Sequence, residues 1–186
     1  MQTILGANGI IANELAKELY QSYTKEIRLV SRNPKKINDT DELFSADLLN
    51  PTQTSNAVKG SEIVYFTAGL PYNSKIWVDQ WPIVMRNVID ACKVHNAKLV
   101  FFDNVYMYGQ VKGIMTEETP FNPISIKGKV RGKIAQMLLD EIASQKITAM
   151  ICRAPEFYGP LNTKSGTNST IFYNIKKGKK VQVLVN

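Results

Sequence analysis

Short apolar runs alternate along the chain with segments whose apolar residues recur at helical spacing. The apolar runs predict strands over Met1–Leu5, Glu26–Val30, Leu43–Ala46, Glu62–Phe66, Lys98–Phe102 and Ile147–Cys152. The helical spacing predicts helices over Ile10–Tyr20, Thr52–Lys59, Ile76–Val94 and Ser125–Ser144. Strands and helices that alternate in this way predict an α/β fold, a doubly wound parallel sheet with helices on both faces.

Composition excludes several classes of protein. A chain of 186 residues with 44% hydrophobic and 21% charged residues encloses a real core, so wholesale disorder is excluded. Two cysteines and one histidine provide neither a disulfide scaffold nor the ligand spacing of a zinc site, and no metal is expected. The single His95, with no nucleophile elbow in the sequence, is weak support for a Ser-His-Asp hydrolase.

Charge and hydropathy limit the partners of the chain. The first residues carry no basic leader before a long apolar run, and no stretch approaches the roughly 20 apolar residues that span a bilayer. We therefore expect a cytoplasmic protein with no membrane partner. The net charge of +7 comes from scattered cations, apart from a cluster at Lys176, Lys177, Lys179 and Lys180. Nucleic-acid binding is accordingly the weaker alternative to a solvated basic surface.

A glycine turn follows the first predicted strand. Gly6 permits a tight turn from strand to helix, Gly9 lets a pyrophosphate approach the backbone, and Ala12 lets the helix pack closely on the strand. Asn8 and Ile10 belong to the same turn. At this position in an alternating chain, the turn predicts a Rossmann fold that binds a dinucleotide.

The end of the second predicted strand bears on the choice of cofactor. An acidic residue there would pair with the ribose of NAD, but the sequence has Ser31 and Arg32. A hydroxyl followed by a guanidinium suits a 2′-phosphate, so the sequence favours NADP over NAD. The alternative is an ordinary surface arginine in a turn.

The chain resembles the extended short-chain dehydrogenases/reductases, specifically the NAD-dependent epimerases and dehydratases that act on nucleotide sugars. The glycine turn matches, and Asp47 and Leu48 resemble the segment that holds adenine. Thr67, Ala68 and Gly69 resemble the turn beneath the cofactor, and the stretch from Val105 to Gly109 resembles the active-site loop. The stretch from Arg153 to Pro160 resembles a segment near nicotinamide and substrate, which implies a cofactor contact at Pro155.

The catalytic positions depart from this resemblance. Asn104 stands where the family has a Ser or Thr. The family also has a Tyr and a Lys four residues apart, and the apolar pattern of the following helix aligns Lys129 with the Tyr and Lys133 with the Lys. Lys133 is thus expected to bind the cofactor ribose, while Lys129, or Tyr106 or Tyr108 from the loop, would replace the phenol. Alternatively, Lys127, Lys129 and Arg131 form a solvated helix face.

The resemblance leaves the function open between two main hypotheses. The first is an NAD(P)-dependent epimerase/dehydratase-like oxidoreductase that acts on a sugar or nucleotide sugar by hydride transfer through nicotinamide. The second is a non-catalytic NADP(H)-binding sensor or regulatory protein, which the missing Tyr favours. The family also forms dimers through the two long helices, so a homodimer through residues 76–94 and 125–144 is expected.

The end of the chain reads as the opening of a second lobe. A helix is predicted over Thr170–Lys177 and a strand over Val181–Val185. Six strands already complete the sheet, so we assign residues 1–158 to the NAD(P)-binding Rossmann domain and residues 159–186 to the start of a substrate-binding lobe that reads as truncated.

Overall fold

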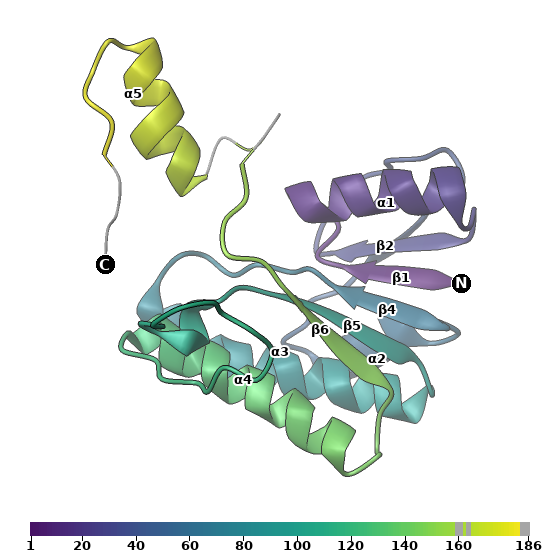
Figure 1. The fold of residues 1–186 in the computed structure, drawn as a ribbon. Helices are drawn as coiled ribbons and strands as arrows, with labels where there is room; N and C mark the ends of the chain where they lie inside the picture. Colours follow the sequence, from purple (N-terminus) through teal and green to yellow (C-terminus); the bar gives the residue numbers. More distant parts are fainter. Residues whose placement is uncertain (159–161, 163–164, 183–186) are drawn as a thin grey trace.

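The chain folds around one parallel six-stranded sheet (Figure 1). The computed structural model describes residues 1–158, 162 and 165–182. The strands are β1 (Gln2–Leu5), β2 (Ile27–Ser31), β3 (Glu42–Ser45), β4 (Ile63–Phe66), β5 (Lys98–Asp103) and β6 (Ala149–Arg153). All pairings are parallel and the order is β3-β2-β1-β4-β5-β6, so the predicted doubly wound fold is confirmed.

Helices cover both faces of this sheet (Figure 1). The helix α1 (Ile10–Ser22) lies on one face, and α2 (Pro51–Val58), α3 (Ser74–Val94) and α4 (Ile126–Ala143) lie on the other. A short 3-10 turn, η1 (Tyr106–Tyr108), follows β5. Every strand and helix predicted up to residue 153 is present, with ends within two residues of the expected ones.

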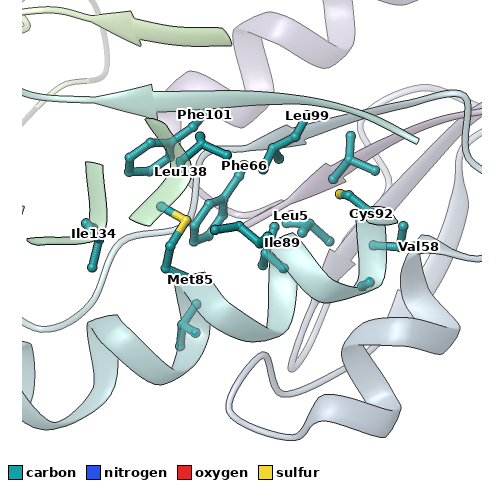
Figure 2. Close-up of a cluster of buried hydrophobic side chains, with 14 of the residues drawn as sticks. Leu5, Val58, Phe66, Met85, Ile89, Cys92, Leu99, Phe101, Ile134 and Leu138 are labelled. Carbon is teal, nitrogen blue, oxygen red and sulfur yellow. The ribbon is translucent and has the colours of Figure 1, made fainter. Parts of the chain in front are cut away.

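Burial on both faces explains why the strands read as apolar runs. Neighbouring residues of one strand, Ile4 and Leu5, are both fully buried but belong to different hydrophobic clusters, one under α1 and one under the other helices. In the larger cluster, Phe66 of β4 stacks on Phe101 of β5 with ring centroids 5.3 Å apart (Figure 2). Met85 of α3 packs into the same cluster.

The turn between β1 and α1 fits only glycine at its first position. Gly6 has a φ of +99°, and a Cβ added there would lie 2.5 Å from the backbone nitrogen of Ala68, which follows β4. The turns after β1 and β4 therefore touch, and this contact fixes the crevice between the two strands.

An ion-pair group joins α3 to α4 on the outer side of the sheet. Glu141 of α4 accepts hydrogen bonds from Arg86 Nη1 at 2.8 Å and from Lys93 Nζ at 2.9 Å, both on α3. These two bonds hold the pKa of Glu141 at about 2, well below its usual value.

The segment after β6 stands apart from the sheet in Figure 1. It contains a π-helical turn, Asn168–Phe172, that continues into α5 (Tyr173–Lys176), in place of the single helix predicted there. The predicted strand Val181–Val185 lies outside the described residues from residue 183 onward, and Val181 and Gln182 are not in a strand. Across the described ranges, no helix combines the length and the apolar character needed to cross a membrane.

We expect Gly6→Ala to destabilise the protein far more than Gly60→Ala. Both glycines have positive φ, but a Cβ at Gly60 would meet nothing within 4 Å. Strain alone at Gly60 should cost about 1 kcal/mol, and overpacking against Ala68 should add roughly 1–3 kcal/mol at Gly6. Urea unfolding of the two variants measures the difference, and equal losses would contradict the tight contact between the turns.

Glu141→Gln should reduce the loss of stability at low pH. The pKa of Glu141 is lower in the folded protein than in the unfolded chain, so its contribution is present above the unfolded pKa and disappears as pH falls towards 2. The free energy of unfolding of the parent should therefore fall more steeply between pH 5 and pH 2 than that of the variant, by urea titration at each pH. Glu118→Gln in an exposed loop is the control; identical slopes for all three proteins would rule out this role for Glu141.

Candidate functional site

A cavity of about 540 Å³ lies at the carboxyl ends of the first four strands. It is centred where the strand order reverses, since β1 neighbours both β2 and β4. The residues that line it are Gly6, Asn8, Gly9, Val30, Ser31, Arg32, Asn33, Ala46, Asp47, Leu48, Leu49, Thr67, Ala68, Gly69, Leu70, Pro71, Ile76, Gln80, Trp81 and Val84.

The floor of the cavity is the N-terminus of α1. Gly9 is the N-cap of this helix, no side chain caps it, and no acidic residue occupies its first turn. The first N–H groups and the helix dipole are therefore available to an anion. A Cβ added at Gly9 would meet only the Gly6 carbonyl oxygen, at 3.4 Å, so the space in front of this backbone is open.

The turn after β1 is tied to the end of β2. Asn8 Nδ2 donates to the carbonyl oxygen of Asn33 at 2.8 Å and to Ser31 Oγ at 3.3 Å. Arg32 between them is exposed, and it is the single Lys or Arg among the described residues that line the cavity. Arg28 on the same strand is engaged elsewhere, by Glu42 and two carbonyl oxygens.

The far walls come from the segments after β3 and β4. Asp47 is half-buried, and its Oδ1 accepts a hydrogen bond from the backbone of Leu49 at 3.0 Å. Thr67 Oγ1 donates to the carbonyl oxygen of Leu5 at 3.1 Å, which holds the turn after β4 beside β1. Gln80 and Trp81 of α3 close the cavity on this side.

Most predicted cofactor residues lie together in this cavity. Those that line it are Gly6, Asn8, Gly9, Ser31, Arg32, Asp47, Leu48, Thr67, Ala68 and Gly69. Ile10, Lys133 and Pro155 are not among its lining residues. Gln80 was missed and Trp81 was interpreted as a packing residue that could border a substrate pocket, because nothing in the helical pattern of residues 76–94 separates residues that face a cavity from residues that face the core.

A buried ion pair lies at the end of β5, outside this cavity. Asp103 is 2% exposed, and its Oδ1 accepts from Arg131 Nε at 2.7 Å and also from Arg131 Nη2. Arg153 of β6 approaches the other oxygen, with Nε 3.9 Å from Oδ2. Burial raises the pKa of Asp103, while the hydrogen bonds and charges of the arginines act to lower it.

The ion pair anchors the loop that follows β5. The backbone N–H of Asn104 donates to Asp103 Oδ1 at 2.8 Å, and that of Tyr106 donates to Asn104 Oδ1 at 3.0 Å. Arg153 Nη1 donates to the hydroxyl oxygen of the buried Tyr108 at 2.9 Å. Asn104 and Tyr108, both predicted site residues, are thus engaged in holding this loop.

An aromatic cluster joins four segments beside the ion pair. Tyr106 stacks on Trp77 with centroids 6.3 Å apart and planes at 19°, and Tyr72 meets Trp77 edge to face at 5.8 Å. Lys127 Nζ lies 3.0 Å from the centroid of the Tyr72 ring. We call these four residues the aromatic cluster. Burial and the neighbouring Tyr72 raise the pKa of Tyr106 to about 12, so its phenol is a weaker acid than usual.

The inward face of α4 carries a different pair of cations from the predicted one. Lys129 and Lys133 are exposed, whereas Arg131 is buried over the rings of Trp81 and Phe101, with Cζ 4.6 and 5.1 Å from the two centroids. Lys127, half-buried in the aromatic cluster, lies four residues before Arg131. Two residues along a helix correspond to about 200°, so the predicted pair lies on the opposite face from this one. The alternative of one solvated face is wrong for Arg131.

A signal for this register is present in the sequence. Arg131 precedes Ile134 by three residues and Leu138 by seven, and both of these are fully buried. Lys129 and Lys133 share spacing with Gln136 and Asp140, which are exposed. The inward stripe therefore runs through Arg131, although its charge argues against burial.

In the part of the chain that is described, no three His, Cys, Asp or Glu residues gather as a metal site would require.

Solved structures with the same fold include three sugar-nucleotide enzymes. A UDP-glucuronic acid 4-epimerase from Bacillus cereus in complex with NAD matches with a TM-score of 0.82 and 18% identity, over 98% of this chain and 66% of that one. A dTDP-glucose 4,6-dehydratase from Streptomyces venezuelae with NAD bound has a TM-score of 0.81 and 12% identity, over 97% and 63%. A UDP-glucose 4-epimerase has a TM-score of 0.73 and 18% identity, over 86% and 53%.

These likenesses establish the fold, and the chain spans just under two thirds of the Bacillus cereus enzyme. No match is found among curated proteins. The sequence itself matches the model of one family, described as NAD dependent epimerase/dehydratase, over residues 3–186. The chain therefore belongs to the NAD dependent epimerase/dehydratase family.

Proposed function

We propose that the protein binds a nicotinamide adenine dinucleotide, NADP(H) in preference to NAD(H), in the cavity at the switch point of the sheet. The observation that carries this proposal is the uncapped N-terminus of α1, which meets the open space at Gly9 on the cavity floor. A pyrophosphate placed there would accept hydrogen bonds from the first N–H groups of the helix.

The side chains around the cavity set the orientation of the ligand. Arg32 and Asp47 follow β2 and β3, so the adenosine half would lie on that side. The exposed guanidinium of Arg32 suits a 2′-phosphate, and no carboxylate follows β2 to pair with a free ribose hydroxyl. The other nucleotide half would then extend past Thr67 towards β5.

Family membership supports oxidoreductase chemistry on a sugar. When bound, the nicotinamide ring would supply or accept the hydride. The three enzymes compared above are named for nucleotide sugars, and we extend that substrate class to this chain. Reduction of a sugar carbonyl requires a proton at the oxygen as hydride reaches the carbon, and Lys127 is the amine on the inward side of α4 that can donate one.

A second function, cofactor binding without turnover, is favoured by the contacts that the inward side chains of α4 make within the protein. The side chain four residues after Lys127 is Arg131, whose guanidinium is bound to Asp103 and covered by aromatic rings. Arg131 is therefore not free to hold a ribose or to activate a phenol. A protein with this arrangement would sense or carry the dinucleotide.

Arg32→Ala should remove the preference for NADPH. The parent should bind NADPH more tightly than NADH, and loss of a charge-assisted contact to the 2′-phosphate should cost about 1–3 kcal/mol for NADPH alone. Calorimetric titration with both cofactors measures this, with Lys35→Ala as a control for general positive charge. Equal affinity of the parent for NADPH and NADH would contradict the assignment of Arg32.

Lys127→Met and Lys129→Met separate the two functions and the two faces of α4. With NADP+ as the oxidant and UDP-glucose or UDP-glucuronic acid as the alcohol, the single-turnover rate of NADPH formation should fall about 100-fold or more in Lys127→Met, because in this direction the same amine accepts the hydroxyl proton. It should be unchanged in Lys129→Met. Binding of NADPH with no turnover in the parent would favour the non-catalytic function, and loss of turnover in Lys129→Met alone would overturn the role of Lys127.

A further inference from the structure

We propose that the indole N–H of Trp81 donates a hydrogen bond to the ligand, and that its acceptor is a hydroxyl oxygen of the second nucleotide half, beyond the pyrophosphate. This inference rests on the proposed dinucleotide binding. It adds a specificity-determining residue for the half of the ligand that Arg131 is not free to hold.

Trp81 carries a buried donor that the protein itself does not use. The residue is 2% exposed, and its Nε1 has no hydrogen-bond partner among the described residues. A buried indole N–H usually has an acceptor, because leaving it without one costs free energy. Trp77, one turn earlier on α3, follows this rule, since its Nε1 donates to the carbonyl oxygen of Pro71 at 2.9 Å. The unpartnered donor is therefore particular to Trp81.

The neighbours of the Trp81 ring supply no oxygen or nitrogen acceptor. The ring centroids of Phe66 and Trp77 lie 6.0 Å from that of Trp81, at interplanar angles of 60° and 81°. The guanidinium of Arg131 lies over the ring, with Cζ 4.6 Å from its centroid, and a guanidinium has only donors. Packing thus holds the indole in place but leaves its nitrogen without an acceptor.

Trp81 is also the one residue with a buried unpartnered side-chain atom that lines the cavity, within the part of the chain that the structure describes. The other such atoms are Asp103 Oδ2, Arg153 Nε and Arg153 Nη2. These belong to residues of opposite charge, with Nε 3.9 Å from Oδ2, and neither residue lines the cavity. The cavity is therefore where an acceptor for Trp81 is expected.

The position of Trp81 in the fold indicates which part of the ligand would supply that acceptor. Trp81 packs on Phe66 of β4, and the guanidinium above it also lies over Phe101 of β5. The pyrophosphate is placed at Gly9, at the N-terminus of the helix on the other face of the sheet. From there the second nucleotide half would extend past Thr67 towards β5. Its ribose hydroxyls are oxygen acceptors for a neutral N–H.

The chain has two tryptophans, which allows a direct spectroscopic test. In a nitrogen–proton correlation spectrum of the parent, each indole N–H gives one signal, which is assigned by its loss in Trp77→Phe or Trp81→Phe. Saturation with NADPH should shift the Trp81 signal, because its N–H gains an acceptor. The Trp77 signal should shift less, because its N–H already has one. A Trp81 signal that does not move when NADPH binds would overturn the inference, whatever the stability of the variants.

Calorimetric titration of the two variants measures what the contact contributes. Trp81→Phe keeps an aromatic ring but removes the N–H, so NADPH should bind about three- to tenfold more weakly than to the parent. Trp77→Phe removes a donor that is used within the protein, and its affinity for NADPH should stay within about twofold of the parent. Adenosine 2′,5′-bisphosphate, which lacks the second nucleotide half, should bind to Trp81→Phe and to the parent equally. Urea unfolding shows whether each variant is folded.

The contrary results separate this inference from the function on which it rests. Equal weakening of NADPH and adenosine 2′,5′-bisphosphate in folded Trp81→Phe would overturn the assignment to the second half of the ligand. Unchanged NADPH affinity in that variant would overturn the contact itself, and both results leave dinucleotide binding intact. A folded parent that binds neither compound would overturn the proposed function, and this inference with it.

Discussion

The close approach of two backbone turns is the constraint on which the site depends. Gly6 after β1 lies so near Ala68 after β4 that no side chain fits between them. The order in which the strands are added to the sheet reverses between β1 and β4, and a crevice lies at the carboxyl ends of these two parallel strands. The N-terminus of α1 then points into that crevice with its N–H groups unengaged. The site that we propose for a phosphate-bearing ligand thus depends on the topology together with one residue without a Cβ.

The side of the crevice next to β5 is built around a buried ion pair. Asp103 and Arg131 are both buried, and each makes the burial of the other tolerable, since an unpaired charge there would be strongly destabilising. Their pairing fixes the loop after β5 through Asn104 and leaves Arg131 under the rings of α3. The fold of the family is retained, while the residues that face inward from α4 form a structural cluster.

The architecture was predictable because its determinants are local. Apolar runs and helical spacing specify each element up to residue 153, and the position of Gly6 and Gly9 directly after the first strand predicts a phosphate-binding turn. The sequence alignment to an expected Tyr and Lys selected Lys129 and Lys133, which are exposed. The inward pair, Lys127 and Arg131, lies two residues earlier and shares its face with the buried Ile134 and Leu138. Arg131 is buried only because Asp103, 28 residues earlier, pairs with it. Such long-range pairing leaves no local signal, and the same holds for the stacking of Tyr106 on Trp77.

Binding at the glycine turn is the central claim, and Gly9→Val tests it most directly. Gly9 has ordinary extended backbone angles and open space before it, so a valine there should leave the fold intact while its side chain fills the position of the pyrophosphate. The measurement is quenching of tryptophan fluorescence on titration with NADPH, alongside a urea unfolding curve for each protein. We predict saturable binding in the parent and loss of at least about 100-fold in affinity in Gly9→Val, with an unfolding midpoint close to that of the parent. Undiminished NADPH binding in a folded Gly9→Val protein would contradict the account.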